Sequence, residues 1–310
     1  MASVPEPAVV EWIAANVEIS AGLPDLLSAD WSRRRVAARE LADALGTRFT
    51  LPGLACAVTE HRVGEILVLH YRPPGEDRPR PAHMSLHGGG FVHGSVHEVV
   101  NDRLLRRRAV DSGVDIFAVD YRLAPEHPFP SGLQDCLDVL SWLADGAEKL
   151  GIDPDRIGVG GASAGGNLAG LVAVHARDNG GPRLVHQVLE VPAASLHIEH
   201  DLSYHDYGKL EDFGDLGDVR DAYLGPTPAK GWAAPAEVPD LTGLPPALVI
   251  TAECDPLRDC GQAYAARLAS AGVPVQTWCA PRQTHGSASV TRTSAIAREW
   301  QDRVSAYLRA

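Results

Sequence analysis

The chain has 310 residues, 45% of them hydrophobic and 22% charged, which is ordinary for a globular protein with a sizeable core. Its formal net charge of −12 leaves no basic stripe to neutralise phosphates, so we expect neither nucleic acid nor an anionic membrane surface as a partner. Five cysteines, an odd number without a C-x-x-C pair, exclude a disulfide framework and predict reduced thiols in a cytoplasmic protein.

The first 50 residues carry apolar side chains at helical spacing, as at Trp12, Ile13 and Val17. They lack the basic region of a signal peptide, and we expect no run in the chain to be long enough to span a membrane. Because they precede any strand pattern, we expect residues 1–50 to form an N-terminal helical cap segment rather than part of a sheet.

The remainder, 51–310, alternates short β-rich runs with helical runs. The β-rich runs lie at 56–62, 65–72, 82–86, 114–121, 156–160, 185–191, 247–252 and 273–279. The helical runs lie at 98–111, 131–147, 164–177, 258–271 and 290–309. This alternation predicts an α/β catalytic domain with a mostly parallel eight-stranded sheet and helices on both faces. The first strands, which no helix separates, predict an antiparallel start.

A glycine run, Gly88, Gly89 and Gly90, follows His87 directly after a predicted strand. Consecutive glycines leave backbone N–H groups able to point into a cavity, where they would hold an oxyanion. An ordinary turn is the alternative, and a phosphate loop is disfavoured because no GK[ST] follows. We interpret His87 as an anchor of this loop.

The segment 120–130, DYRLAPEHPFP, runs from a strand end into a loop that three prolines restrict. We interpret its role as structural, and we expect Glu126 to hydrogen-bond the backbone near the glycine run.

The segment 161–165, GASAG, follows an apolar run and opens a helical one. A G-x-S-x-G sequence in that context predicts a sharp strand-to-helix turn with Ser163 on its crest, exposed as a nucleophile. The N–H of Ala164 would complete the oxyanion hole. Taken alone, the motif is also compatible with a glycine-rich turn that opens a helix.

Residues 197–245 interrupt the alternation and end in a proline-rich stretch. A connection of this length is typical of an active-site lid, so we expect a cap or lid insertion at about 197–245. Its H-x-x-H sequence at His197 and His200 is compatible with a metal site, but the mechanism needs no metal and we predict none.

Asp255 comes just past a predicted strand, and His285 follows the last strand. The order Ser163, Asp255, His285 is that of α/β-hydrolase triads. His285 would take the proton of Ser163, and Asp255 would orient the imidazole. Glu253 and Asp259 are alternative candidates for the role of Asp255. Their positions, two residues earlier on the strand and a helical turn later, direct their side chains away from the site.

These segments together resemble the hormone-sensitive-lipase-like group of the α/β-hydrolase superfamily. The matching sequences are HGGGF (87–91), DYRLAPEHPFP (120–130), GASAGGNLA (161–169), LPPALVITAECDPLRD (244–259) and THG (284–286). The resemblance implies the α/β-hydrolase fold, ester hydrolysis through an acyl-serine, and no metal or organic cofactor. It also implies a helical cap built from the N-terminal segment and the insertion after the sixth strand.

The chain departs from this family's pattern at three places. Ala162 stands where an acid usually precedes the nucleophile, and Ser287 stands where an aromatic residue is usual, so we expect one apolar contact to be missing there. Val191-Pro192 replaces Tyr-Pro, and Glu190 precedes it in an otherwise apolar run. These changes bear on substrate class rather than on the triad.

The sequence therefore predicts a carboxylic ester hydrolase that acts on small-molecule esters, with small or medium acyl groups. Two alternatives remain open: an acyltransferase or cyclase with the same triad, and a non-catalytic binding protein on the same fold. The last strand is a candidate sheet edge for a homodimer.

Overall fold

We describe a computed structural model of the chain, covering residues 3–75, 79–210, 216–226 and 231–310. Parts of the predicted insertion, 211–215 and 227–230, lie outside the described residues.

The described residues form one eight-stranded sheet in the order β1-β2-β4-β3-β5-β6-β7-β8. Its strands are β1 (Ala57–Val63), β2 (Ile66–Arg72), β3 (Arg80–Leu86), β4 (Asp115–Asp120), β5 (Ile152–Ala162), β6 (Leu184–Glu190), β7 (Ala247–Ala252) and β8 (Val275–Ala280). Among the described strands, only the β1–β2 and β2–β4 pairings are antiparallel. The predicted fold, including its antiparallel start, is confirmed.

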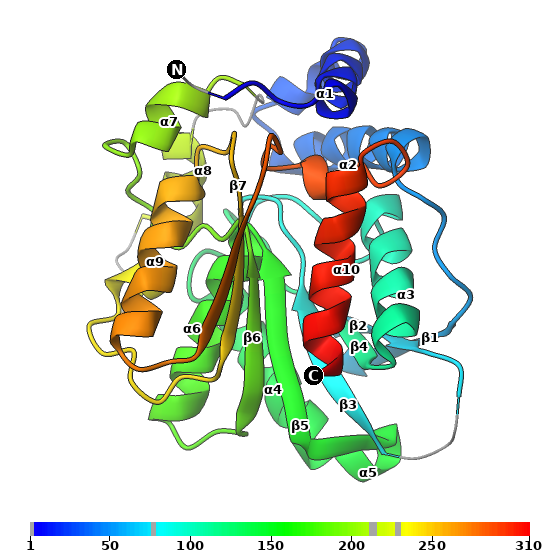
Figure 1. The fold of residues 1–310 in the computed structure, drawn as a ribbon, viewed down its shortest axis with the longest axis vertical. Helices are drawn as coiled ribbons and strands as arrows, with labels where there is room; N and C mark the ends of the chain where they lie inside the picture. Colours follow the sequence, from blue (N-terminus) through cyan, green and yellow to red (C-terminus); the bar gives the residue numbers. More distant parts are fainter. Residues whose placement is uncertain (1–2, 76–78, 211–215, 227–230) are drawn as a thin grey trace.

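Helices cover both faces of the sheet (Figure 1). On one face lie α3 (Val99–Ser112) and α10 (Ala295–Arg309), whose buried side chains include Leu105 and Trp300. On the other lie α4 (Ser131–Asp145), the short α5 (Ala147–Leu150), α6 (Ala164–Asp178) and α9 (Arg258–Ser270), which share the largest apolar core. The central strands are therefore buried on both sides, as a parallel sheet requires.

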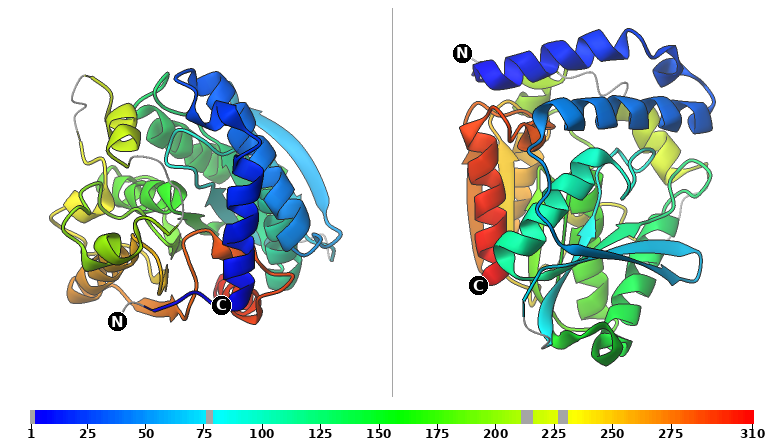
Figure 2. Two further views of the ribbon diagram at one scale, coloured as in Figure 1. Left: turned by 90° about the horizontal axis from the view of Figure 1, so that it is seen from above. Right: turned by 90° about the vertical axis from the view of Figure 1, so that its right-hand side faces the viewer.

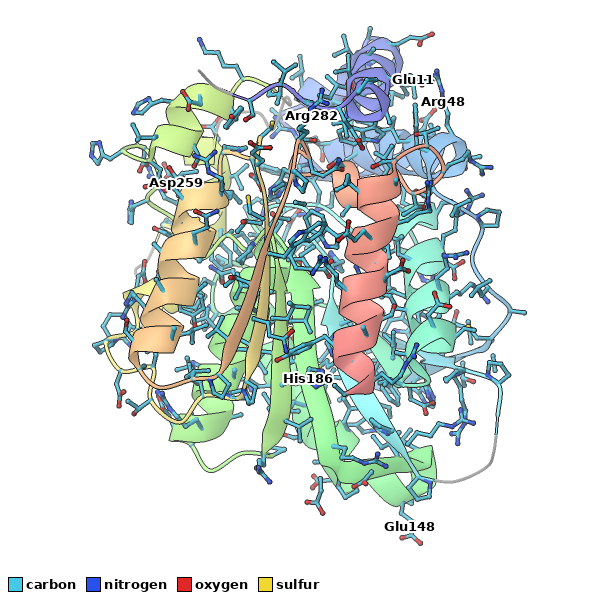
Figure 3. All side chains as sticks on the ribbon, in the orientation of Figure 1. Glu11, Arg48, Glu148, His186, Asp259 and Arg282 are labelled. Atoms are coloured by element: carbon cyan, nitrogen blue, oxygen red, sulfur yellow. The ribbon has the colours of Figure 1, made fainter. Side chains whose placement is uncertain are left out.

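The two segments that break the alternation lie at the same end of the sheet, toward which the parallel strands point (Figure 1). The first comprises α1 (Pro7–Ser20), a 3-10 turn (Pro24–Leu27) and α2 (Trp31–Phe49), with α1 lying over α2 (Figure 2). The second comprises α7 (Leu202–Tyr207), α8 (Leu216–Leu224) and a 3-10 turn (Pro235–Glu237). Arg48 of α2 pairs with Glu11 of α1 at 3.7 Å, and Figure 3 shows both above the sheet.

Two element boundaries differ from the sequence prediction by more than three residues. The last helix begins at Ala295 rather than near 290, because Ser287–Ser289 form a 3-10 turn and Ser294 caps the helix by accepting from the Ala297 N–H at 2.9 Å. β5 begins at Ile152, since that residue already pairs with Arg80 of β3. Within the described residues, every helix is too short or too polar to cross a membrane.

Candidate active site

Ser163 lies at the turn between the carboxyl end of β5 and the start of α6, with φ of 56° and ψ of −117°. A positive φ is uncommon for a residue other than glycine and marks a tightly constrained turn. The turn requires glycine two residues before and two residues after the serine. A Cβ on Gly165 would lie 2.1 Å from the Leu86 carbonyl oxygen, and one on Gly161 would lie 2.5 Å from the same atom. The G-x-S-x-G spacing is thus a packing requirement between β3, β5 and α6.

The structure brings Ser163, His285 and Asp255 into one line, although they come from three separate loops. His285 Nε2 lies 2.8 Å from Ser163 Oγ. His285 Nδ1 lies 2.9 Å from Asp255 Oδ2 and 3.1 Å from its Oδ1. These are hydrogen-bond distances, and the arrangement allows the imidazole to accept the serine proton while the carboxylate faces the opposite ring nitrogen.

Asp255 is fully buried, and its Oδ1 also accepts the Leu257 N–H at 2.8 Å. The two rival acids face other partners. Glu253 accepts from Ser3 Oγ at 2.5 Å and from the Arg282 N–H at 2.7 Å. Asp259 accepts the Ser203 N–H at 2.9 Å, and Figure 3 shows it at the α7 end of α9. Of the three acids, Asp255 is the one placed against the imidazole, at 2.9 Å from His285 Nδ1.

The loop that carries His285 is held by a buried hydrogen-bond network. Ser287 Oγ accepts the Thr284 N–H at 2.9 Å and donates to Gln283 Oε1 at 2.8 Å. Gln283 Nε2 donates to Glu6 Oε1 at 2.8 Å, and Ser294 Oγ donates to the same oxygen. Ser287, expected to leave an apolar contact missing, therefore forms polar contacts that fix the loop.

The glycine run lies against the serine. A Cβ on Gly88 would stand 3.6 Å from Ser163 Cβ, and Gly89 has φ of 114°, which a side chain would strain. His87 anchors the loop: its Nδ1 lies 2.8 Å from the Gly88 oxygen, and its ring stacks on Tyr121 at 4.2 Å between centroids. The Tyr121 hydroxyl donates to the His87 carbonyl at 2.7 Å, and burial lowers the pKa of His87. A neutral, packed His87 fits the predicted structural role. Ala164 opens α6, where the first N–H groups have no partner within the helix.

Helix α8 packs on the same loop. A Cβ on Gly90 would meet Val219 Cγ1 at 3.1 Å. The ring of Phe91 stacks on Tyr223 at 3.7 Å, and the Tyr223 carbonyl accepts the Phe129 N–H at 2.7 Å. The insertion therefore contacts both the glycine run and the 120–130 loop.

Arg35 of α2 joins the N-terminal segment to these loops, and the sequence analysis did not single it out. Its guanidinium donates to the carbonyls of Val92 at 2.8 Å and Ala124 at 2.7 Å. It also pairs with Glu126 at 2.5 Å, and this hydrogen bond lowers the pKa of that carboxyl. Arg35, rather than Glu126, makes the backbone contacts expected near the glycine run. No local motif identifies it, because its partners lie 57 and 89 residues away.

The fold and the geometry of these loops define the α/β-hydrolase class, and comparison with known proteins gives the same result. Residues 83–289 match the family described as having the alpha/beta hydrolase fold. The chain is 41% identical over 233 residues to carboxylesterase NlhH of Mycobacterium tuberculosis, covering 72% of this chain and 71% of that protein. It is 39% identical over 228 residues to ethyl acetate hydrolase of Pseudomonas putida, covering 69% of each. A solved hyperthermophilic esterase from the archaeon Pyrobaculum calidifontis superposes with a TM-score of 0.85 at 34% identity, over 99% of this chain and 98% of the other.

The chain belongs to the hormone-sensitive-lipase-like family of carboxylesterases. It is a carboxylic ester hydrolase that uses serine chemistry, and the comparisons do not favour the acyl-transfer and binding-protein alternatives.

Proposed function

We propose that Ser163 is the nucleophile of this hydrolase, His285 its general base and acid, and Asp255 the group that orients His285. The observation that carries the proposal is the line of contacts from Ser163 Oγ through His285, 2.8 Å and 2.9 Å long, to a fully buried carboxylate. The N–H groups of Gly88, Gly89, Gly90 and Ala164 are the proposed oxyanion donors.

In this mechanism Ser163 Oγ attacks the ester carbonyl carbon while its proton passes to His285 Nε2. The bond to the alcohol oxygen then breaks, and that oxygen takes the proton from His285. A water molecule attacks the acyl carbon and gives a proton to His285. Release of the acid returns this proton to Ser163 Oγ, so the enzyme is regenerated.

Replacement of the nucleophile tests these roles. We expect Ser163→Ala to lower kcat for p-nitrophenyl acetate at least about 10⁴-fold and to abolish labelling by a fluorophosphonate. Ser141→Ala, an exposed serine on α4, is the matched control and should keep full activity and labelling. Wild-type turnover by Ser163→Ala would refute the assignment.

We further propose that residues 1–50 and about 197–245 cap the site of a catalytic domain formed by 51–310, and that the cap favours small or medium acyl groups. The contacts of α8 with Gly90 and Phe91, and the ethyl acetate hydrolase among the relatives, support this. We expect kcat/KM for p-nitrophenyl esters to fall beyond medium acyl lengths, and Val219→Ala to move that limit to longer chains. An unchanged profile would contradict the proposal.

Two broader features belong to the proposal. The exposed edge at β8 supports a homodimer formed by pairing of two such strands. The five cysteines are free, which supports a location in the reducing cytoplasm. The proposed partners are small-molecule esters and not nucleic acid.

A further inference from the structure

A buried carboxylate lies directly beside the residue that precedes Ser163. Glu190 ends β6, and in the parallel pairing of β5 with β6 it stands opposite Ala162. Side chains paired in this way project on the same face of a sheet. Glu190 is 3% exposed, and its backbone carbonyl accepts the Ser163 N–H at 2.9 Å. Glu190 thus contacts Ser163 through its backbone carbonyl and places its carboxylate beside Ala162, the residue before the serine.

The Glu190 carboxylate has a complete set of buried partners. Arg108 of α3 binds it through both terminal nitrogens, at 2.7 Å each. Trp300 of α10 donates from its indole nitrogen to Glu190 Oε2 at 2.7 Å. The two charged side chains are 11% and 5% exposed, so water screens the pair weakly.

The same guanidinium reaches the loop of the general base. Arg108 Nε donates to Gln301 Oε1 at 2.8 Å. Gln301 Nε2 donates to the backbone carbonyl of Ala288 at 2.8 Å, three residues after His285. A continuous polar chain therefore connects the backbone at Ser163 with the backbone beyond His285, through the side chains of Glu190, Arg108 and Gln301.

The space beside Ala162 suits a carboxylate. Arg108, Ala162, Glu190 and Ala288 all line one cavity of about 90 Å³ behind the turn that carries Ser163. The next residue of the β6 end, Val191, has φ of 38°, which a β-branched residue rarely adopts. Such a conformation persists only where its surroundings hold it, and the anchored Glu190 side chain is adjacent.

We propose that the Arg108–Glu190 pair positions Ser163 and His285 relative to each other, and that Glu190 replaces the acid which the family usually has at position 162. Glu190 is a positioning residue, because its carboxylate is turned away from Ser163 Oγ toward α3 and α10. This inference rests on the roles proposed above for Ser163 and His285.

The test begins with Glu190→Gln, which keeps the shape of the side chain but leaves the Arg108 charge buried without its partner. We expect kcat to fall about 10- to 100-fold with KM changed less than about twofold, because small displacements of reacting groups slow chemistry without removing substrate contacts. The rate of fluorophosphonate labelling of Ser163 should fall by a similar factor. Asp115→Asn is the matched control: Asp115 is fully buried and paired with His70 at 2.5 Å, at the start of β4, and its loss should lower the melting temperature but not kcat.

A rescue variant makes the test specific to the position of the charge. In Ala162→Asp/Glu190→Gln, the new carboxylate occupies the cavity beside Arg108, and we expect kcat to return to within about threefold of wild type. Should Glu190→Gln fold poorly, Arg108→Met/Glu190→Met removes both charges without leaving either unpaired. We expect that variant to stay folded and to show the same loss of kcat.

Wild-type kcat and labelling in folded Glu190→Gln or in the double methionine variant would overturn the inference, as would a failure of Ala162→Asp to restore activity. These outcomes are independent of the triad itself. Wild-type turnover by Ser163→Ala refutes the proposed function, whereas Glu190→Gln changes the rate of an otherwise intact triad.

Discussion

At the scale of single residues, the site depends on buried polar groups that hold the loop of His285. Ser287, Gln283 and Thr284 are fully buried behind His285 and bond to one another. Their hydrogen bonds fix the backbone that carries the imidazole, because a buried polar group without a partner is costly. Ser287 thus holds this loop by hydrogen bonds, whereas the aromatic residue usual in the family would hold it by apolar packing.

Removal of the Ser287 hydroxyl tests that interpretation. Ser287→Ala leaves the Thr284 N–H and the Gln283 side chain without this partner, so we expect the free energy of unfolding to fall by about 1–3 kcal/mol. We also expect kcat to fall about tenfold, because the imidazole is less well placed. Urea unfolding and steady-state kinetics measure the two effects. A variant with unchanged kcat would show that the loop is held by other contacts.

At the scale of elements, β3, β5 and β6 are joined across the sheet by two histidines. His83 Nδ1 lies 3.0 Å from His186 Nε2, and the strand between them, β5, has glycines where the rings pass. A Cβ on Gly158 would lie 2.1 Å from His186 Nε2. Burial lowers the pKa of His186 to about 4 and the pKa of His83 well below its usual value, so both rings are neutral in the folded protein at pH 7. Figure 3 shows His186 away from the end of the sheet at which α1 and α2 lie.

This pair predicts a loss of stability in acid. The unfolded chain binds a proton at each histidine near pH 6.5, whereas folded His186 does so only near 4. The free energy of unfolding should therefore be unaffected by this residue above pH 6.5 and should fall by about 3 kcal/mol as the pH drops to 4. We expect His186→Phe to have a shallower pH dependence in urea unfolding over that range. A slope equal to that of wild type would contradict the prediction.

At the scale of the whole molecule, the sheet has an open edge at β8, which pairs only with β7 among the described strands. Thr277 is exposed on this strand. In an antiparallel pairing of two β8 strands, a lysine introduced at position 277 would lie near its counterpart from the other copy. The two positive charges would repel each other and weaken the pairing. We expect light scattering to give a dimer for wild type and a monomer for Thr277→Lys, with Ser270→Lys on α9 as the control. A monomeric wild type would refute the dimer.

Much of the fold was accessible from the sequence, because alternating strands and helices dictate a parallel sheet and strand ends collect functional groups at one edge. Ser163, Asp255 and His285 follow three such strand ends. The Arg108–Glu190 pair was not accessible, since its partners are 82 residues apart and no local pattern relates a helix arginine to a strand acid. Glu6 and Arg35 could not be identified for the same reason. Glu6 binds Gln283, 277 residues away, and Arg35 binds Val92, 57 residues away.

The role of Ser163 as nucleophile is tested most directly by identifying the residue that carries the acyl group during turnover. Rapid acid quench of wild-type enzyme with p-nitrophenyl acetate, followed by peptide mass spectrometry, should find an acetyl group on Ser163. His285→Ala should form it much more slowly, because nothing then accepts the serine proton. Acetylation of another residue during turnover, or turnover without any acyl-serine, would contradict the role of Ser163 as nucleophile.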